Sequence, residues 1–316
     1  MKTVLVTGCA GLIGSHLSEY LLNRGDRVIG VDEMNKYYSL KQKEENLNML
    51  KSFENFSFFK LDICEFDELL EICKSCEVNY IAHLAARAGV RASIENPFIY
   101  EHSNSQGTLS VLEVARELNI ENSVITSSSS VYGDRESVPF SESDCVDFPI
   151  SPYAATKKAC ELMSYTYHHL YGLNINVIRP FTIYGPRGRP DMAPYLFMSK
   201  ILNGEEITKY GSGDTYRDYT YIDDFVDGFV SALDSPLGYE IFNLGNNSPI
   251  SLNEFISTIE EVCGRRAIVR EIGMQQGDVS KTYANISKAQ RLLGYSPRVS
   301  LREGMEEMRR WFEEMK

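Results

Sequence analysis

Lys2-Thr3-Val4-Leu5-Val6-Thr7, followed at once by Gly8-Cys9-Ala10-Gly11-Leu12-Ile13-Gly14, has the pattern of a buried strand that enters a glycine-rich turn. The apolar, β-branched run is typical of a strand covered on both faces of a parallel sheet. Helical periodicity then continues to Arg24 and stops at Gly25, and a second strand over residues 27–31 ends at Asp32. Strand, glycine turn, helix, strand and terminal acid together predict a unit that binds a dinucleotide.

The turn and the acid also predict how such a ligand would bind. The glycines let the backbone approach a pyrophosphate at the helix N-terminus, and Asp32 can accept hydrogen bonds from ribose hydroxyls. Glu33 adds a second negative charge that would repel a 2′-phosphate, so the sequence favours NAD over NADP. A plain tight turn between strand and helix is the weaker alternative.

The alternation of strands and helices continues as far as residue 179. Strand patterns cover residues 56–60, 78–83, 123–126 and 174–179, and long helices are expected over about 97–119 and 153–171. This order predicts an α/β fold with a doubly wound parallel sheet, whose ligands lie beyond the carboxyl ends of the strands. The residues just past such ends are Gly8, Asp32, Asp62, Ala85, Ser128 and Pro180.

After Pro180 the strict alternation lapses. We expect residues 1–181 and about 236–264 to form the NAD-binding Rossmann domain, with a strand over 240–244 that rejoins the sheet. Residues about 182–235 and 265–316 are expected to form a smaller C-terminal substrate-binding lobe, and residues 301–316 a final helix.

Ser151-Pro152-Tyr153 and Lys157 suggest a proton-transfer device. Ser151 can cap a helix and Pro152 suits its first position, so Tyr153 and Lys157 project from the same face, one turn apart. A phenol has a pKa of about 10, and a nearby ammonium would lower that value. A buried Tyr beside a solvated Lys is the alternative, but the dinucleotide unit makes the catalytic interpretation the stronger one.

Composition excludes several other classes of function. The net charge of −12 argues against a nucleic-acid partner, because binding phosphates requires a basic face. No apolar stretch approaches the length of a membrane span, and no signal peptide is expected. The seven cysteines include one close pair, Cys73 and Cys76, without a second pair or a His cluster, so we predict no metal site and a cytoplasmic protein.

Motifs spread over the whole chain resemble the extended short-chain dehydrogenase/reductase family, in its branch of NAD-dependent nucleotide-sugar epimerases and dehydratases. The matching segments are TGCAGLIGSH at 7–16, Asp32, Leu61-Asp62, Leu84-Ala85-Ala86, Asn104 with Gly107-Thr108, SSSSVYG at 127–133, Tyr153 with Lys157, Arg179-Pro180, and RDYTYIDD at 217–224. Narrower features resemble UDP-glucuronate 4-epimerases: NKYY at 35–38, AGVR at 88–91, YGPRGRPDM at 184–192, and QGDV at 276–279 followed by TYA at 282–284.

The resemblance implies a cofactor site, a catalytic group and a dimer. In the family pattern Tyr153 removes a proton from the sugar's C4 hydroxyl, Ser128 hydrogen-bonds the same oxygen, and Lys157 holds the phenolate and the nicotinamide ribose. Two copies would associate as a homodimer through the helices at about 97–119 and 153–171. The residues expected to bind NAD are Gly8, Gly11, Leu12, Ile13, Gly14, Asp32, Asn35, Asp62, Ile63, Leu84, Ala85, Ala86, Asn104, Tyr153, Lys157 and Pro180.

The same resemblance predicts the substrate and its contacts. Thr182 stands where neutral-sugar epimerases of the family tend to carry Asn, which favours an acidic sugar. We therefore expect C4 epimerisation of UDP-glucuronate to UDP-galacturonate through a transient 4-keto sugar. The residues expected to contact substrate are Arg91, Ser128, Ser129, Ser130, Thr182, Arg189 and Arg217. Surface ion pairs with nearby Asp residues are the alternative for Arg189 and Arg217.

Other activities stay open. A UDP-glucose or UDP-N-acetylglucosamine 4-epimerase is the first alternative, and a nucleotide-sugar reductase with a dissociable cofactor is the second. Dehydration is disfavoured because Ser129 and Ser130 occupy the places where dehydratases of the family carry an Asp-Glu pair. A non-catalytic NAD-sensing protein of this fold would be expected to lack Tyr153 or Lys157, and both are present.

Overall fold

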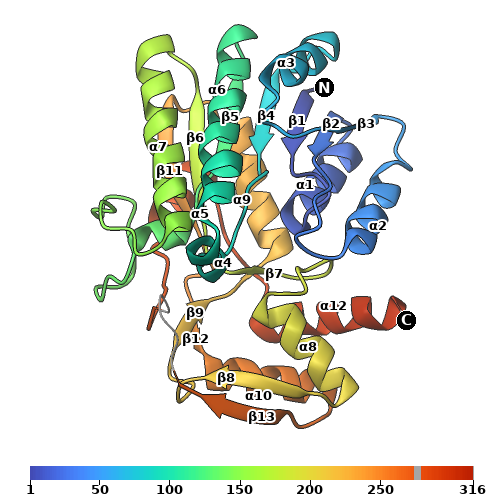
Figure 1. The fold of residues 1–316 in the computed structure, drawn as a ribbon, viewed down its shortest axis with the longest axis vertical. Helices are drawn as coiled ribbons and strands as arrows, with labels where there is room; N and C mark the ends of the chain where they lie inside the picture. Colours follow the sequence, from blue (N-terminus) through green and yellow to red (C-terminus); the bar gives the residue numbers. More distant parts are fainter. Residues whose placement is uncertain (274–278, 316) are drawn as a thin grey trace.

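A computed structural model describes residues 1–273 and 279–315 and has a seven-stranded parallel sheet at its centre (Figure 1). The strand order is β11-β6-β5-β4-β1-β2-β3, and every neighbouring pair is parallel. Chain order reverses between β1 and β4, which is where ligands bind in doubly wound sheets. The strands are β1 (Thr3–Thr7), β2 (Arg27–Asp32), β3 (Phe56–Lys60), β4 (Tyr80–His83), β5 (Asn122–Thr126), β6 (Ile175–Pro180) and β11 (Tyr239–Leu244). The predicted fold class is confirmed.

Helices cover both faces of this sheet. Within β1, Leu5 belongs to one apolar core while Val4 and Val6 belong to the other, because successive side chains of a strand point to opposite faces. One layer contains α3 (Phe66–Ser75), α6 (Gly107–Glu117) and α7 (Pro152–Tyr171). The other contains α1 (Leu12–Asn23), α2 (Leu40–Leu50), α9 (Ile222–Asp234) and α11 (Ser287–Leu293).

The helix expected over residues 97–119 is built from three joined pieces. Short α4 (Val90–Glu95) precedes it, and α5 (Pro97–Tyr100) leads into a π-helical turn, η1 (Glu101–Gln106), which continues as α6. A π-helical turn adds a residue to the turn and is common at functional sites. The sequence pattern predicted the helical path but not this turn, which carries Asn104 on its inner side.

Smaller elements form a lobe beyond the carboxyl ends of the strands (Figure 1). Its two-stranded sheets pair β8 with β13, β9 with β12, and β7 with β10. The strands are β7 (Ile183–Tyr184), β8 (Glu206–Tyr210), β9 (Tyr216–Asp218), β10 (Thr220–Tyr221), β12 (Pro249–Ser251) and β13 (Ile268–Ile272). The helices are α8 (Ala193–Asn203), α10 (Leu252–Cys263) and α12 (Leu301–Glu314), and a 3₁₀ turn, η2 (Ser129–Tyr132), follows β5 in the main domain.

The contacts of two helices differ from those expected from the predicted domain boundaries. Helix α9 packs against α1 and against β4, β5 and β6, so it belongs with the main sheet although it falls within residues 182–235. Helix α10 packs against α8 and α12 in the lobe, although it falls within residues 236–264. Strand β11 rejoins the sheet beside β6, as predicted. The division into two domains itself stays a prediction.

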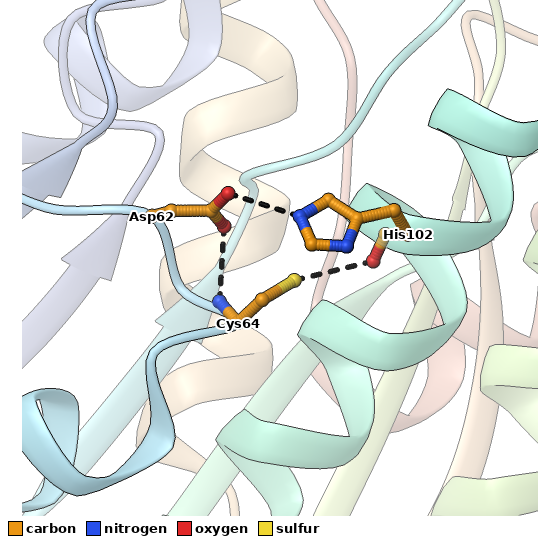
Figure 2. Close-up of side chains that lie close together, drawn as sticks. All are labelled: Asp62, Cys64 and His102. Carbon is orange, nitrogen blue, oxygen red and sulfur yellow. Dashed lines mark hydrogen bonds and ion pairs between the residues drawn. The ribbon is translucent and has the colours of Figure 1, made fainter.

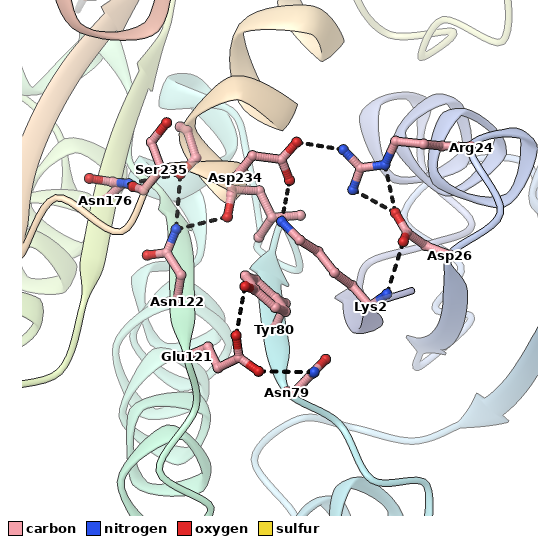
Figure 3. A network of polar contacts seen from close by, with 12 residues as sticks. Lys2, Arg24, Asp26, Asn79, Tyr80, Glu121, Asn122, Asn176, Asp234 and Ser235 are labelled. Atoms are coloured by element: carbon pink, nitrogen blue, oxygen red, sulfur yellow. Dashed lines mark hydrogen bonds and ion pairs between the residues drawn. The ribbon is translucent and has the colours of Figure 1, made fainter.

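A polar network holds the end of α9 to the amino-terminal edge of the sheet (Figure 3). The Asn122 amide donates to the carbonyl oxygens of Ala232 and Leu233 at 3.0 and 2.9 Å. The Asn176 amide donates to those of Ala232 and Ser235 at 2.8 and 2.7 Å. These bonds satisfy carbonyls that the last turn of a helix leaves without intrahelical partners. Asp234 adds ion pairs to Lys2 and Arg24.

Within residues 1–273 and 279–315, no helix combines the length and apolarity needed to cross a membrane.

His83 is buried at the carboxyl end of β4, where it links three elements. Its Nδ1 lies 2.8 Å from the Thr7 hydroxyl on β1, and its Nε2 lies 3.0 Å from the Thr108 hydroxyl on α6. Burial lowers the pKa of His83 to about 3, and the charge of Lys157 acts in the same direction. These contacts indicate a structural role for His83, which links β1, β4 and α6.

This depressed pKa predicts that the free energy of unfolding falls on acidification. The unfolded chain takes up a proton on His83 near pH 6.5, whereas the folded protein leaves it neutral down to about pH 3, so acid favours unfolding between these values. His83→Gln should reduce the slope of unfolding free energy against pH by about 1.4 kcal/mol per pH unit. Urea unfolding between pH 4 and 7 measures both slopes, and equal slopes would contradict the assignment.

Candidate active site

A cavity of about 740 Å³ runs along the carboxyl ends of the strands and continues under the lobe. Of the residues predicted to bind cofactor or substrate, all but Asn104 line it. The cavity thus joins the glycine turn, the Tyr153–Lys157 pair and the predicted substrate contacts. Its volume is within the range of small-molecule sites in proteins.

The glycine turn leaves room that side chains would remove. Gly8 has a φ of +71°, and a Cβ on it would lie 2.9 Å from the backbone nitrogen of Ala85. A Cβ on Gly14 would lie 2.1 Å from the carbonyl oxygen of Gly8. Helix α1 begins after Gly11 without a side-chain cap, and its first residues line the cavity, so its free N–H groups suit an anionic pyrophosphate. The turn therefore fits a dinucleotide.

Asp32 is oriented by two hydrogen bonds, one from the glycine turn and one from the segment that follows β2. It accepts from the backbone N–H of Met34 at 2.8 Å and from that of Ala10 at 3.3 Å. Lys43 on α2 lies 3.6 Å from the same carboxylate, and both side chains are buried. The sequence pattern identified Asp32 but not Lys43, because a lysine in an amphipathic helix gives no signal of burial.

Asp62, predicted to bind the cofactor, already contacts two neighbours (Figure 2). One oxygen accepts from the backbone N–H of Cys64 at 3.0 Å, and the other lies 3.1 Å from Nε2 of His102. Burial raises the pKa of Asp62, but these hydrogen bonds outweigh it and hold the pKa below its usual range. His102 therefore shares the carboxylate at this subsite, which the sequence analysis missed.

The same three residues are the one group in the described chain whose donor atoms lie close enough to suggest a metal. They satisfy each other, however, since the Cys64 thiol donates to the His102 carbonyl at 3.3 Å. Burial and the charge of Asp62 raise the pKa of Cys64 to about 12, which keeps the thiol protonated and makes it a poor ligand. The cluster is thus complete as a hydrogen-bonded unit.

Asn104 is the predicted cofactor contact that does not line the cavity. It is fully buried on η1, and it exchanges hydrogen bonds with the backbone of Arg87, accepting at 2.8 Å and donating at 3.1 Å. It also donates to the Thr156 hydroxyl at 2.9 Å. Asn104 therefore lies behind the cavity wall, where it fixes the segment after β4 against α7.

The predicted catalytic residues Tyr153, Lys157 and Ser128 line the same cavity as Asp62. The Ser151 hydroxyl caps α7 by accepting from the Ala154 N–H at 3.1 Å, and Pro152 opens the helix, as predicted. This start places Tyr153 in the first turn, where its ring packs edge-on against Tyr100. Ser128, just past β5, lies close enough to the Tyr153 hydroxyl to lower its pKa.

The electrostatics of Tyr153 differ from the prediction. Burial raises its pKa, and the opposing influences are the Ser128 hydrogen bond and the charge of Arg189, not Lys157. Lys157 is itself buried, which lowers its pKa, and its ammonium donates to the Thr126 carbonyl at 2.7 Å. Lys157 follows Tyr153 by one turn of α7, but its ammonium bonds to β5, so its expected hold on the phenolate stays a prediction.

The predicted substrate contacts gather around Tyr153 from several loops. Ser129 and Ser130 follow Ser128, and Thr182 follows β6. Arg189 forms a two-point ion pair with Asp191, at 3.0 and 2.6 Å, and its guanidinium lies 5.2 Å from the ring centre of Tyr37. The ion pair named as the alternative for Arg189 thus exists, at a residue that also lines the cavity.

Arg217 and Arg91 line the cavity from the lobe side and from α4. Arg217 donates to the carbonyl of Tyr216 at 2.8 Å, and the Arg91 guanidinium lies 4.6 Å from the ring centre of Tyr210. Gln276, Gly277 and Asp278 of the predicted family motif lie outside the described residues.

Sequence reasoning also missed a buried ion pair behind the catalytic group. Glu161 and Arg179 form two parallel hydrogen bonds of 2.8 Å, and the Ser127 hydroxyl donates to Glu161 at 2.6 Å. A signal existed, since Glu161 follows Lys157 by four residues and so lies on the same face of α7.

Comparison with known proteins agrees with this geometry. The family model described as GDP-mannose 4,6-dehydratase matches residues 5–308. The chain is 47% identical to a UDP-glucuronate 4-epimerase of Thermodesulfobacterium geofontis, over 99% of this chain and 97% of that protein. It is also 49% identical to an uncharacterised protein of Methanocaldococcus jannaschii, over 100% of this chain and 97% of that protein.

Solved structures of similar proteins contain the expected ligands. The UDP-glucuronic acid 4-epimerase of Bacillus cereus, solved with UDP-glucuronic acid and NAD, superposes with a TM-score of 0.93 at 35% identity, over 99% of this chain and 100% of that one. The UDP-glucose 4-epimerase of Thermotoga maritima, solved with UDP-glucose, gives 0.91 at 31% identity, over 99% of each chain. The chain therefore belongs to the GDP-mannose 4,6-dehydratase family of extended short-chain dehydrogenases/reductases, among its NAD-dependent nucleotide-sugar 4-epimerases.

Proposed function

We propose that this protein interconverts UDP-glucuronate and UDP-galacturonate through transient oxidation at C4, with NAD as its cofactor. The observation that carries the proposal is a single cavity with two parts. One part is lined by a glycine turn that fits a dinucleotide, and the other by Tyr153, Ser128 and four polar residues: Ser129, Ser130, Thr182 and Arg189. Relatives named as UDP-glucuronate 4-epimerases support the choice of sugar.

The residues of the chain supply the proton transfer and the positioning. When bound, NAD supplies the hydride acceptor for C4 and returns the hydride afterwards. Tyr153 takes the proton of the C4 hydroxyl, and Ser128 hydrogen-bonds the same oxygen. The positive charge of Arg189 favours the Tyr153 phenolate and opposes the effect of burial. Lys157, anchored to Thr126, holds the nicotinamide ribose next to this pair.

The carboxylate of the sugar creates a hazard that the site must control. Oxidation of C4 gives a β-keto acid, which loses CO₂ when the C5–carboxylate bond aligns with the carbonyl π system. Several donors that grip the carboxylate together can hold it out of alignment. Ser129, Ser130 and Thr182 can supply hydroxyl or backbone donors. Arg189 adds charge, because Asp191 engages only two of its five N–H groups.

The first prediction concerns the substrate. Purified protein should convert UDP-glucuronate to UDP-galacturonate without added reductant, and Arg189→Ala should lower kcat/KM for this sugar by about 10- to 100-fold, the effect of losing a charged hydrogen bond. Any UDP-pentose formed by decarboxylation should increase relative to the epimer. NMR of the product mixture measures both.

UDP-glucose serves as the control. Arg189→Ala should lower its turnover less than that of UDP-glucuronate, because both sugars lose the charge that favours the Tyr153 phenolate but only UDP-glucuronate loses a partner for its carboxylate. Wild-type protein that turns over UDP-glucose or UDP-N-acetylglucosamine but not UDP-glucuronate would favour the neutral-sugar alternative.

Tyr153→Phe tests the base. The variant keeps the aromatic ring that packs on Tyr100 but lacks the proton acceptor, so turnover should fall below a few per cent of wild type. Bound NAD, measured after denaturing the purified protein, should stay near the wild-type amount. Substantial remaining turnover would assign the proton transfer to another group.

We further propose a homodimer and a cytoplasmic location. Helices α5 and α7 expose Phe98, Leu162, Tyr165 and Leu170, an apolar face that a two-fold contact would cover. The location is supported by seven cysteines that are all free.

Light scattering at micromolar concentration should give about twice the chain mass of 35.8 kDa. Leu162→Lys, which places a charge on the exposed face, should shift the mass toward the monomer. A monomeric wild-type protein would contradict the dimer.

A further inference from the structure

Helix α2 buries three polar side chains on one face. Gln42, Lys43 and Asn46 are at most 7% exposed, although Lys41 on the same helix is largely in solvent. Residues separated by three or four positions lie on one side of a helix, so these three point in a common direction. Polar groups are rarely buried unless specific partners satisfy them.

Each of the three contacts a different segment of the chain near the cavity. The Asn46 amide donates to the Ala10 carbonyl in the glycine turn at 2.9 Å. Lys43 lies 3.6 Å from Asp32, the predicted ribose acceptor. The Gln42 amide donates to the carbonyls of Arg187 and Gly188 at 2.8 and 2.7 Å, on the segment that follows β7.

That segment, residues 185–191, needs external support. Arg187 has a φ of +62°, a left-handed conformation that costs energy for a residue with a Cβ and persists only where surroundings impose it. Its carbonyl is held by Gln42, and its guanidinium pairs with Glu19 on α1. Arg189 follows two residues later and lines the cavity.

We propose that Gln42 is a positioning residue: by holding the carbonyls of Arg187 and Gly188, it places Arg189 for the carboxylate of the sugar. This inference deepens the proposed function and rests on it. The same helix holds the cofactor side through Lys43 and Asn46, so α2 fixes the distance between the cofactor half and the substrate half of the cavity.

Two substitutions separate hydrogen bonding from packing. Gln42→Met keeps the length of the side chain and removes the donors at every pH. Gln42→Glu keeps the shape, but an ionised carboxylate facing two carbonyl acceptors repels them, whereas a protonated carboxyl donates to one. Burial raises the pKa of such a carboxyl above its usual value of about 4.3, so the protonated form becomes accessible under mildly acidic conditions.

The first readout is kcat/KM for UDP-glucuronate from pH 5.5 to 8.5, divided by the wild-type value at each pH so that the ionisation of the base cancels. Gln42→Glu should be about tenfold or more below wild type at pH 8 and recover as the pH falls. Gln42→Met should be reduced by a factor that does not change with pH. Lys41→Met, on the exposed side of α2, should match wild type throughout.

The second readout needs no substrate. Trypsin can cut after Arg187 but not after Arg189, because Pro190 follows, so cleavage between Arg187 and Gly188 reports the order of this segment alone. Mass spectrometry should show this cut several-fold faster in both Gln42 variants than in wild type and Lys41→Met. If one variant fails to fold, the other still gives this comparison.

Wild-type rates of cleavage and wild-type kcat/KM in both Gln42 variants would overturn the inference. A pH-independent loss in Gln42→Glu, equal to that in Gln42→Met, would also overturn it, because packing alone would then explain the effect. Failure of wild type to act on UDP-glucuronate would instead refute the proposed function, while the tryptic cut would still test the positioning by Gln42.

Discussion

The buried ion pair between Glu161 and Arg179 is the constraint on which the catalytic geometry depends. Both side chains are 1% exposed, and burying two charges costs several kcal/mol each unless every donor and acceptor is satisfied. Besides the two hydrogen bonds between them, Glu161 accepts a hydrogen bond from the Ser127 hydroxyl. Arg179 also donates to the Tyr132 hydroxyl at 2.9 Å. The requirement for full satisfaction fixes α7 against the ends of β5 and β6, and so holds Tyr153 beside Ser128.

Helices α1 and α2 also hold segments that form the cavity. Gln42 and Glu19 hold the segment that carries Arg189, while Lys43 and Asn46 hold the cofactor wall. The cofactor part and the substrate part of the cavity are therefore held in place by contacts of α7 and by contacts of α2. A sugar that must rotate its oxidised ring between two faces needs such a fixed frame, because only the ring is free to move.

The sequence predicted most of the sheet and most of the cavity because both follow local rules. Periodicity located the seven strands of the sheet, and the positions just past their ends identified Gly8, Asp32 and Ser128. Local rules do not reach contacts between distant segments of the chain. The bond from Lys157 to Thr126 and the bond from the Arg87 N–H to Asn104 therefore had no signal in the sequence. Lys43 and Gln42 were invisible because their partners lie in distant segments of the chain.

The central claim is that C4 is oxidised and reduced again by a cofactor that never releases the hydride to solvent. The most direct test uses UDP-glucuronate carrying deuterium at C4, with NMR of the UDP-galacturonate formed in ordinary water. The account predicts that the product keeps its deuterium at C4 and gains no solvent hydrogen at C4 or C5. Loss of the label to water, or exchange at C5, would contradict it and indicate inversion by proton removal from carbon.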